Sequence, residues 1–129
     1  MRVCLDTTAY SGFKRGDPQI TGIMETAEDV LVPAVVLGEL HAGFQTGDRA
    51  GRNTRELEDF LDRPGVLVVD VDRRIAERYG LLFKALKEIG RPVPTNDLWI
   101  AAVAVETGSR LLSDDSHFDV IPGVFRLRG

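Results

Sequence analysis

Residues 95–115 read Thr-Asn-Asp-Leu-Trp-Ile-Ala-Ala-Val-Ala-Val-Glu-Thr-Gly-Ser-Arg-Leu-Leu-Ser-Asp-Asp, an apolar stretch followed by a short apolar run and two acids. This pattern predicts a helix from Asp97 to Glu106, with Thr95 or Asn96 as its N-cap. Leu111-Leu112 then predicts a strand that stops before the two acids. The stretch therefore places one acid in the first turn of a helix and a pair of acids just after a strand.

Outward from this unit, short apolar runs alternate with helical patterns along the whole chain. Asp17-Pro18 indicates a helix start, because Asp suits the N-cap and Pro tolerates the first helical position. The other predicted strands are residues 3–5, 30–32, 66–69 and 124–127, and the other predicted helices lie around residues 36–44, 57–61 and 75–89. Short apolar strands separated by helices indicate a parallel sheet covered on both faces. We predict a single α/β domain, residues 1–129, with about five parallel strands sandwiched between helices.

The composition is that of a globular protein, with 43% hydrophobic and 28% charged residues in a chain of 129. The single cysteine, Cys4, excludes an internal disulfide, and one cysteine with two widely spaced histidines excludes a zinc site of the Cys/His kind. No apolar stretch reaches the roughly 20 residues that span a bilayer. Asp6 interrupts the N-terminal apolar run before it could form the core of a signal peptide. The sequence therefore indicates a cytoplasmic protein without a membrane segment.

The net charge of −4 argues weakly against nucleic acid as a partner, since nucleic-acid binders usually carry a basic face. The 16 Lys and Arg residues are nevertheless unevenly placed. Arg49, Arg52 and Arg55 recur at helical spacing, and a second basic cluster runs from Arg73 to Arg91. An acidic pocket between basic rims would explain this pattern, and so would two solvated helix faces of mixed charge.

Ligands of open parallel sheets bind outside the carboxyl ends of the strands, where the strand order reverses. Asp6 follows the first predicted strand, Asp97 begins its helix, and Asp115 follows the fourth predicted strand. Glu39 lies past the first turn of its helix among apolar residues, where the helix dipole contributes little, so a cation beside it would explain its position. Each acid also has a local interpretation, as a cap, a turn residue or an exposed side chain. Their joint placement at one edge of a sheet favours a common site.

Four carboxylates at one site require a cation, because two charges about 5 Å apart repel by roughly 3 kcal/mol at an effective dielectric near 20. Without a cation, some of the acids would protonate or move apart. Ligand sets made of oxygen alone favour Mg²⁺ or Mn²⁺ over zinc or copper. Mg²⁺ usually keeps several waters and takes one or two carboxylates, which leaves room for a phosphodiester and an attacking water.

Four segments follow one another in a fixed order along the chain: Leu5-Asp6-Thr7, Gly38-Glu39-Leu40, residues 96–102 (Asn-Asp-Leu-Trp-Ile-Ala-Ala) and residues 112–118 (Leu-Ser-Asp-Asp-Ser-His-Phe). Together they resemble the PIN domain, and more narrowly the VapC toxins of type II toxin–antitoxin systems. Gly90-Arg91 and Ile121-Pro122-Gly123 fit this family as well. The resemblance covers the whole chain from Asp6 onward, and Asp-Leu-Trp-Ile-Ala-Ala is its most specific part.

The resemblance implies a metal-dependent endoribonuclease that hydrolyses phosphodiester bonds in structured or single-stranded RNA, such as loops of tRNA or rRNA. It implies that Mg²⁺ or Mn²⁺ is held by four catalytic acids, which are Asp6, Glu39, Asp97 and Asp115. In the last motif of the family the acid stands two residues after Ser or Thr, which favours Asp115 over Asp114. Supporting roles around the acids are implied for Thr7, Asn96 and Ser113, with capping or turn bonding as the alternative.

The resemblance also implies a cognate VapB-like antitoxin, which inserts a basic side chain near the acids, and a homodimer. Apolar Leu81, Leu82, Phe83 and Leu86 exceed one helical stripe, which a dimer contact and a fully buried helix explain equally well. His117 stands where the family often has Asp or His, and the sequence leaves both RNA contact and a structural role open. A chain without a histidine acid–base pair is poorly suited to attack by a ribose 2′-hydroxyl, so we expect hydrolysis that leaves a 5′-phosphate.

Two other functions fit parts of the pattern. One is a PIN fold that binds RNA without cleaving it. The other is a phosphoacceptor receiver domain, a signalling module in which Asp70 would be the phosphorylated residue. Receivers normally carry paired acids after the first strand and a lysine after the last core strand. Here Thr7 and Thr8 follow Asp6 and no lysine follows Lys87, which argues against a receiver.

Overall fold

The computed structural model describes residues 1–127, so the last two residues of the predicted domain 1–129 lie outside the described residues. The strands are β1 (Arg2–Leu5), β2 (Asp29–Pro33), β3 (Val66–Val69), β4 (Arg110–Leu112) and β5 (Arg126–Leu127). The helices are α1 (Thr7–Lys14), α2 (Pro18–Thr26), α3 (Ala34–Gln45), α4 (Ala50–Leu61), α5 (Arg73–Glu88), α6 (Thr95–Thr107) and the 3₁₀ helix η1 (Ser116–Val120).

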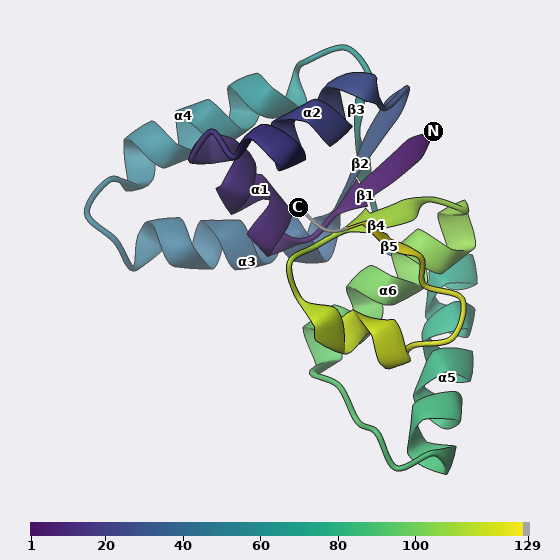
Figure 1. The fold of residues 1–129 in the computed structure, drawn as a ribbon. Helices are drawn as coiled ribbons and strands as arrows, with labels where there is room; N and C mark the ends of the chain where they lie inside the picture. The colour runs from purple at the N-terminus through teal and green to yellow at the C-terminus, as the bar shows by residue number, and fades with distance from the viewer. Residues whose placement is uncertain (128–129) are drawn as a thin grey trace.

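All neighbouring strands of the sheet run parallel, in the order β3-β2-β1-β4-β5. Figure 1 shows α1 to α4 on one face of the sheet and α5 with α6 on the opposite face. Right-handed crossovers produce this division, because the chain moves outward from β1 to β3 and then returns past β1 to β4. The predicted α/β fold, with a five-stranded parallel sheet sandwiched between helices, is confirmed. The strand order excludes a receiver domain, which arranges its strands 2-1-3-4-5.

The strand order reverses at β1, which pairs with β2 on one side and with β4 on the other. Such a reversal opens a crevice at the carboxyl ends of the strands, because the connecting helices leave toward opposite faces. Here the crevice lies where β1 and β4 end, and the backbone N–H of Asp6 donates to the carbonyl of Leu112 across 3.3 Å. Two of the predicted site residues, Asp6 and Ser113, thus directly follow the strands that border it.

The elements beside the crevice are deeply buried. Val3, Cys4 and Leu5 of β1 are fully buried, and α6 buries five consecutive residues, 100–104. A helix that buries consecutive residues is covered all round, unlike an amphipathic surface helix. The packed core therefore fixes the two elements that carry Asp6 and Asp97.

Helix α1 is absent from the sequence-based prediction. Thr7, Thr8 and Gly12 are poor helix formers, so the local propensity is low. The Asp6 side chain caps the helix by accepting a hydrogen bond from the backbone N–H of Ala9. Gly12 faces Ile20 so closely that a side chain at position 12 would collide with it. Capping and packing therefore form a helix that propensity alone does not indicate.

Two predicted boundaries are wrong. Helix α6 has Pro94 as its N-cap, and neither Thr95 nor Asn96 caps it with a side chain. A proline at this position fixes an extended backbone without supplying a side-chain acceptor. The predicted strand 124–127 shortens to Arg126–Leu127, because the N–H of Val124 donates to Ile121 in a turn.

Several apolar side chains of the predicted elements face solvent. Leu81 and Phe83 of α5 are 59% and 52% exposed, so the explanation by a fully buried helix is wrong. Leu67 and Val68 of the edge strand β3 are 49% and 46% exposed, so this edge strand is only partly covered on each face. Within residues 1–127, no helix is both long enough and apolar enough to cross a membrane.

Candidate active site

Asp6 is a buried carboxylate, only 3% exposed, at the end of β1. Its Oδ1 accepts hydrogen bonds from the Thr8 hydroxyl at 2.7 Å and from the Ala9 N–H at 2.9 Å. Its Oδ2 accepts a short bond, 2.5 Å, from the Ser113 hydroxyl. Burial raises the pKa of Asp6, although these hydrogen bonds act in the opposite direction, and the negative charge of Asp115 raises it further. The fold thus maintains an acid whose charge is poorly solvated.

Ser113 joins Asp6 to Asp115. Ser113 is fully buried after β4, and its hydroxyl both donates to Asp6 and accepts the backbone N–H of Asp115 at 2.9 Å. The Asp115 side chain is 49% exposed, so it can reach a ligand at the surface of the crevice. The neighbouring Asp114 is held differently, since its N–H donates to the Thr8 hydroxyl at 3.1 Å.

Both carboxylate oxygens of Glu39 accept hydrogen bonds. The Thr7 hydroxyl donates to Oε1 at 2.6 Å, and the Asn96 amide donates to Oε2 at 3.5 Å. These contacts join α3 to the start of α1 and to the start of α6. Thr7 and Asn96 therefore use their side chains to hold an acid, and neither acts as the cap that was their alternative interpretation.

Asp97 and Asp115 are connected through His117, which lies in η1. His117 Nε2 is 2.7 Å from Asp97 Oδ2, and His117 Nδ1 is 3.6 Å from Asp115 Oδ1. The imidazole ring also stacks on Phe118, with ring centroids 4.9 Å apart. The sequence identified His117 without a role, and the structure places it between two of the predicted acids.

These contacts form a closed ring, which we call the acid ring. On one side, contacts link Asp6 to Ser113, Ser113 to Asp115, Asp115 to His117, and His117 to Asp97. On the other side, Asn96, the chain neighbour of Asp97, contacts Glu39, and Glu39 accepts a hydrogen bond from Thr7, the chain neighbour of Asp6. Within residues 1–127, no Lys or Arg forms an ion pair with any of the four acids. The structure thus brings all seven predicted site residues to the crevice at the strand-order reversal.

The ring supplies carboxylate, hydroxyl and amide oxygens, which suit Mg²⁺ or Mn²⁺ better than softer metals. As the side chains stand, no group of three or more His, Cys, Asp or Glu in residues 1–127 is close enough to hold an ion. His117 contacts Asp97 and Asp115, two of the acids that would hold the ion. The chemistry of the donors therefore fits a divalent cation, for which His117 would compete at these two acids.

Arg126, which the sequence did not indicate, fixes the loop that follows β4. Its guanidinium binds both oxygens of Asp119, at 2.8 and 3.1 Å, and donates to the carbonyl of Ser113 at 3.0 Å. The bidentate bond lowers the pKa of Asp119. Sequence spacing gives no signal for this contact, because it depends on the register that places Arg126 beside Leu111.

The fold separates the residues of the second predicted basic cluster, which runs from Arg73 to Arg91. Arg74 and Arg78 of α5 pair with Glu106, at 3.7 and 3.1 Å. Glu106 lies nine residues beyond Asp97 on α6, about 13 Å along the helix. These two arginines are therefore engaged at the end of α6 that lies away from the acid ring. Arg91 instead shares a pocket with His117 and is placed beside the ring.

Comparison with known proteins gives consistent matches over nearly the full chain. The PIN domain family matches residues 3–124. Ribonuclease VapC4 of Mycobacterium tuberculosis is 30% identical over 125 residues, which cover 95% of this chain and 93% of that protein. The structure of VapBC-5 from Mycobacterium tuberculosis is 26% identical with a TM-score of 0.79, covering 99% of this chain and 98% of that chain. The structure of VapBC2 from Rickettsia felis, bound to promoter DNA, shares the fold at 22% identity, with a TM-score of 0.87 and coverage of 99% and 98%.

A parallel sheet that gathers acids at its strand-order reversal, matched by one family over almost its whole length, defines a PIN domain. Within the PIN domain family, the chain belongs to the VapC ribonuclease toxins of VapBC toxin–antitoxin systems. The resemblance found in the sequence motifs is thereby confirmed.

Proposed function

We propose that the chain is a Mg²⁺- or Mn²⁺-dependent endoribonuclease that hydrolyses phosphodiester bonds in exposed RNA loops, such as those of tRNA or rRNA. The acid ring is the observation that carries this proposal, because it links four carboxylates that are far apart in the sequence. Single-stranded or looped RNA suits the site better than duplex, since an unpaired backbone bends more readily into a crevice.

The four acids Asp6, Glu39, Asp97 and Asp115 are the residues that would hold the cation. When bound, Mg²⁺ or Mn²⁺ lowers the pKa of a water and stabilises charge on the scissile phosphate. Thr7 and Asn96 fix the carboxylate of Glu39, while Ser113 fixes that of Asp6. One of the four carboxylates accepts the proton of the attacking water. The ribose 3′-oxygen then leaves, and the product carries a 5′-phosphate.

The proposed partners are a cognate VapB-like antitoxin and a second copy of the chain. The relatives from Mycobacterium tuberculosis and Rickettsia felis were solved as VapBC proteins, which supports an antitoxin partner. A basic side chain from the antitoxin would be attracted to the acid ring, where no Lys or Arg of residues 1–127 pairs with the acids. Exposed Leu81 and Phe83 on α5 support a dimer contact, because large apolar side chains are usually covered.

The experiment that tests the function is cleavage of labelled total RNA and of a tRNA pool with Mg²⁺ or Mn²⁺. Wild type is compared with Asp97→Asn and Asp115→Asn, and Asp114→Asn serves as the matched control. We expect discrete cuts with 5′-phosphate ends that EDTA abolishes, that both site variants lose, and that Asp114→Asn retains. Cleavage that persists in both site variants would exclude the acid ring as the catalytic site. Loss in Asp114→Asn but not in Asp115→Asn would reverse the assignment of the fourth acid.

A further inference from the structure

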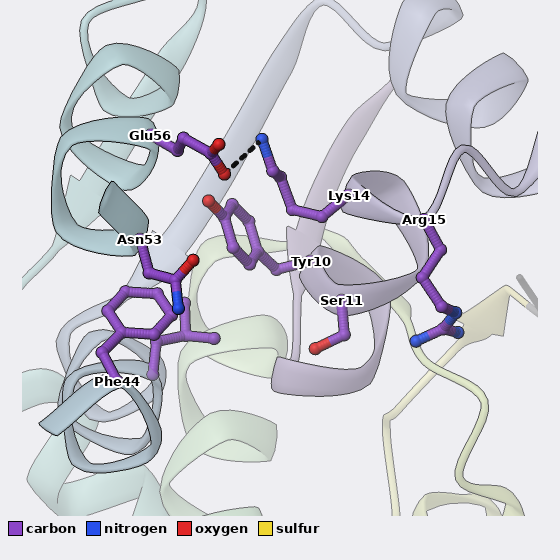
Figure 2. A pocket seen from close by; sticks show the side chains of 8 residues that line it. Tyr10, Ser11, Lys14, Arg15, Phe44, Asn53 and Glu56 are labelled. Carbon is purple, nitrogen blue, oxygen red and sulfur yellow. Dashed lines mark ion pairs between the residues drawn. The ribbon is translucent and has the colours of Figure 1, made fainter. Parts of the chain in front are cut away.

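A pocket of about 240 Å³ lies between α1, α3 and α4. Figure 2 shows Tyr10 and Lys14 of α1 facing Asn53 and Glu56 of α4, with Phe44 of α3 along one side. The Lys14 ammonium and the Glu56 carboxylate form an ion pair at 3.2 Å, so these two groups close one wall. None of these residues belongs to the acid ring.

The pocket begins next to the acid ring. On α1, the pocket residue Ser11 follows Thr7 by four positions, which is about 6 Å along a helix. On α3, the pocket residue Leu40 directly follows Glu39. The hydrogen bond of 2.6 Å between Thr7 and Glu39 joins the two helices at this end. A chain of nucleotides whose phosphate lies at the ring would therefore place a neighbouring nucleotide at the pocket.

Apart from the Lys14–Glu56 ion pair, the pocket is lined by three uncharged polar side chains that have no hydrogen-bond partner in the described part of the chain. Within residues 1–127, the Asn53 amide and the hydroxyls of Tyr10 and Ser11 form no hydrogen bond. Asn53 is half-buried, although an amide offers both a donor and an acceptor that the fold would otherwise satisfy. Phe44 adds a flat aromatic surface, and the exposed Arg15 at the rim forms no ion pair with any residue that the structure describes.

We propose that this pocket binds one unpaired nucleobase beside the cleaved phosphodiester, and that Asn53 and Phe44 thereby determine which base is accepted there. The inference rests on the proposed nuclease function. An amide recognises a base edge by donating and accepting at once, and an aromatic ring stacks on a splayed-out base. The volume lies below the roughly 300 to 1,000 Å³ of pockets for larger ligands, which suits a single base. Arg15 at the rim would contact the phosphate of the same nucleotide.

The test is cleavage of an RNA pool with random sequence, followed by sequencing of the new 5′ ends. Wild type is compared with Asn53→Ala, Phe44→Ala and Phe44→Tyr, and Gln45→Ala is the control on the exposed side of α3. We expect wild type to prefer one base at a single position near the cut, by about tenfold. In Asn53→Ala and Phe44→Ala, cleavage of the preferred sequences should fall to the rate of the others, so the preference is lost. Phe44→Tyr, which keeps the ring, and Gln45→Ala should retain it.

An unchanged preference in both alanine variants would overturn the proposal, as would a rate that falls equally for all sequences. The same holds if these variants weaken only the binding of an antitoxin, since the pocket would then recognise a protein. If wild type does not cleave RNA, the proposed nuclease function is refuted, and measurements of RNA binding then test the pocket separately. Fluorescent RNA hexamers should then bind Phe44→Ala about tenfold more weakly than wild type or Phe44→Tyr. Equal binding of the hexamers would refute a nucleobase pocket.

Discussion

His117 places one ring nitrogen near each of two acids, with Nε2 in a hydrogen bond of 2.7 Å to Asp97 Oδ2 and Nδ1 3.6 Å from Asp115 Oδ1. One side chain thus occupies the space between two acids that come from different elements, α6 and the loop after β4. Because the imidazole ring already contacts both acids, it would compete with a divalent cation for their oxygens.

Replacement of His117 by Ala should therefore strengthen Mn²⁺ binding several-fold while destabilising the metal-free protein. The variant loses hydrogen bonding worth about 1 kcal/mol, so the melting temperature in EDTA should fall by a few degrees. Calorimetric titration with Mn²⁺ and thermal unfolding measure the two effects. His41→Ala, which removes the other histidine of the chain, is the control. Weaker Mn²⁺ binding in His117→Ala would show that His117 helps to hold the ion.

The buried carboxylate of Asp6 should make the metal-free protein less stable as the pH rises. Because burial raises its pKa, the folded state keeps the Asp6 proton at pH values where the unfolded chain has lost it. The free energy of unfolding contributed by this group then falls as the pH rises from the ordinary carboxyl range through the raised pKa. Asp6→Asn retains an oxygen for Thr8 and Ala9, so it should unfold at a higher temperature than wild type at pH 7 in EDTA, and it should not cleave RNA. Thermal unfolding from pH 5 to 8 tests this, and a lower melting temperature at every pH would contradict it.

Loss of Arg126 should reduce cleavage although Arg126 is not one of the acids. Arg126→Met releases the Ser113 carbonyl and Asp119, so the loop that carries Asp115 loses its anchor. A displacement of about 1 Å at a catalytic group can lower the rate about 100-fold, and we expect a loss between 10- and 100-fold. The same substitution at the exposed Arg110 on β4 is the control. Full activity in Arg126→Met would show that η1 and β4 position the loop without it.

Cys4 should be chemically inert in the folded protein. It is fully buried, and burial, with a smaller contribution from the charge of Asp6, raises its pKa to about 12. Almost no thiolate forms at pH 8, and the thiolate is the species that reacts. A disulfide reagent should therefore label Cys4 only after urea unfolds the chain. Rapid labelling at pH 8 without urea would indicate that the centre of the sheet opens readily.

The sequence predicted what depends on local pattern. The strands appear as apolar runs. Asp6, Asp97 and Asp115 were identified because they follow strands or begin a helix, and Glu39 because it is a carboxylate among apolar residues. Helix α1 was missed, since its stability comes from the Asp6 cap and from packing of Gly12 on Ile20. The cap of α6 was predicted at Thr95 or Asn96 but lies at Pro94, and the Asn96 amide instead contacts Glu39, 57 residues away. Contacts of this range depend on strand register and helix packing, which a pattern of residue types does not encode.

The anchoring of Ser113 by Arg126 also bears on the order in which the chain is synthesised. All four acids have been incorporated once Asp115 has been added to the growing chain. The strand that fixes the last of them, β5, is made eleven residues later and lies at the edge of the sheet. A nascent chain therefore carries every acid of the ring before it carries the residue that fixes their geometry. The geometry of the acid ring is thus completed only after Arg126 has been added and β5 has paired with β4.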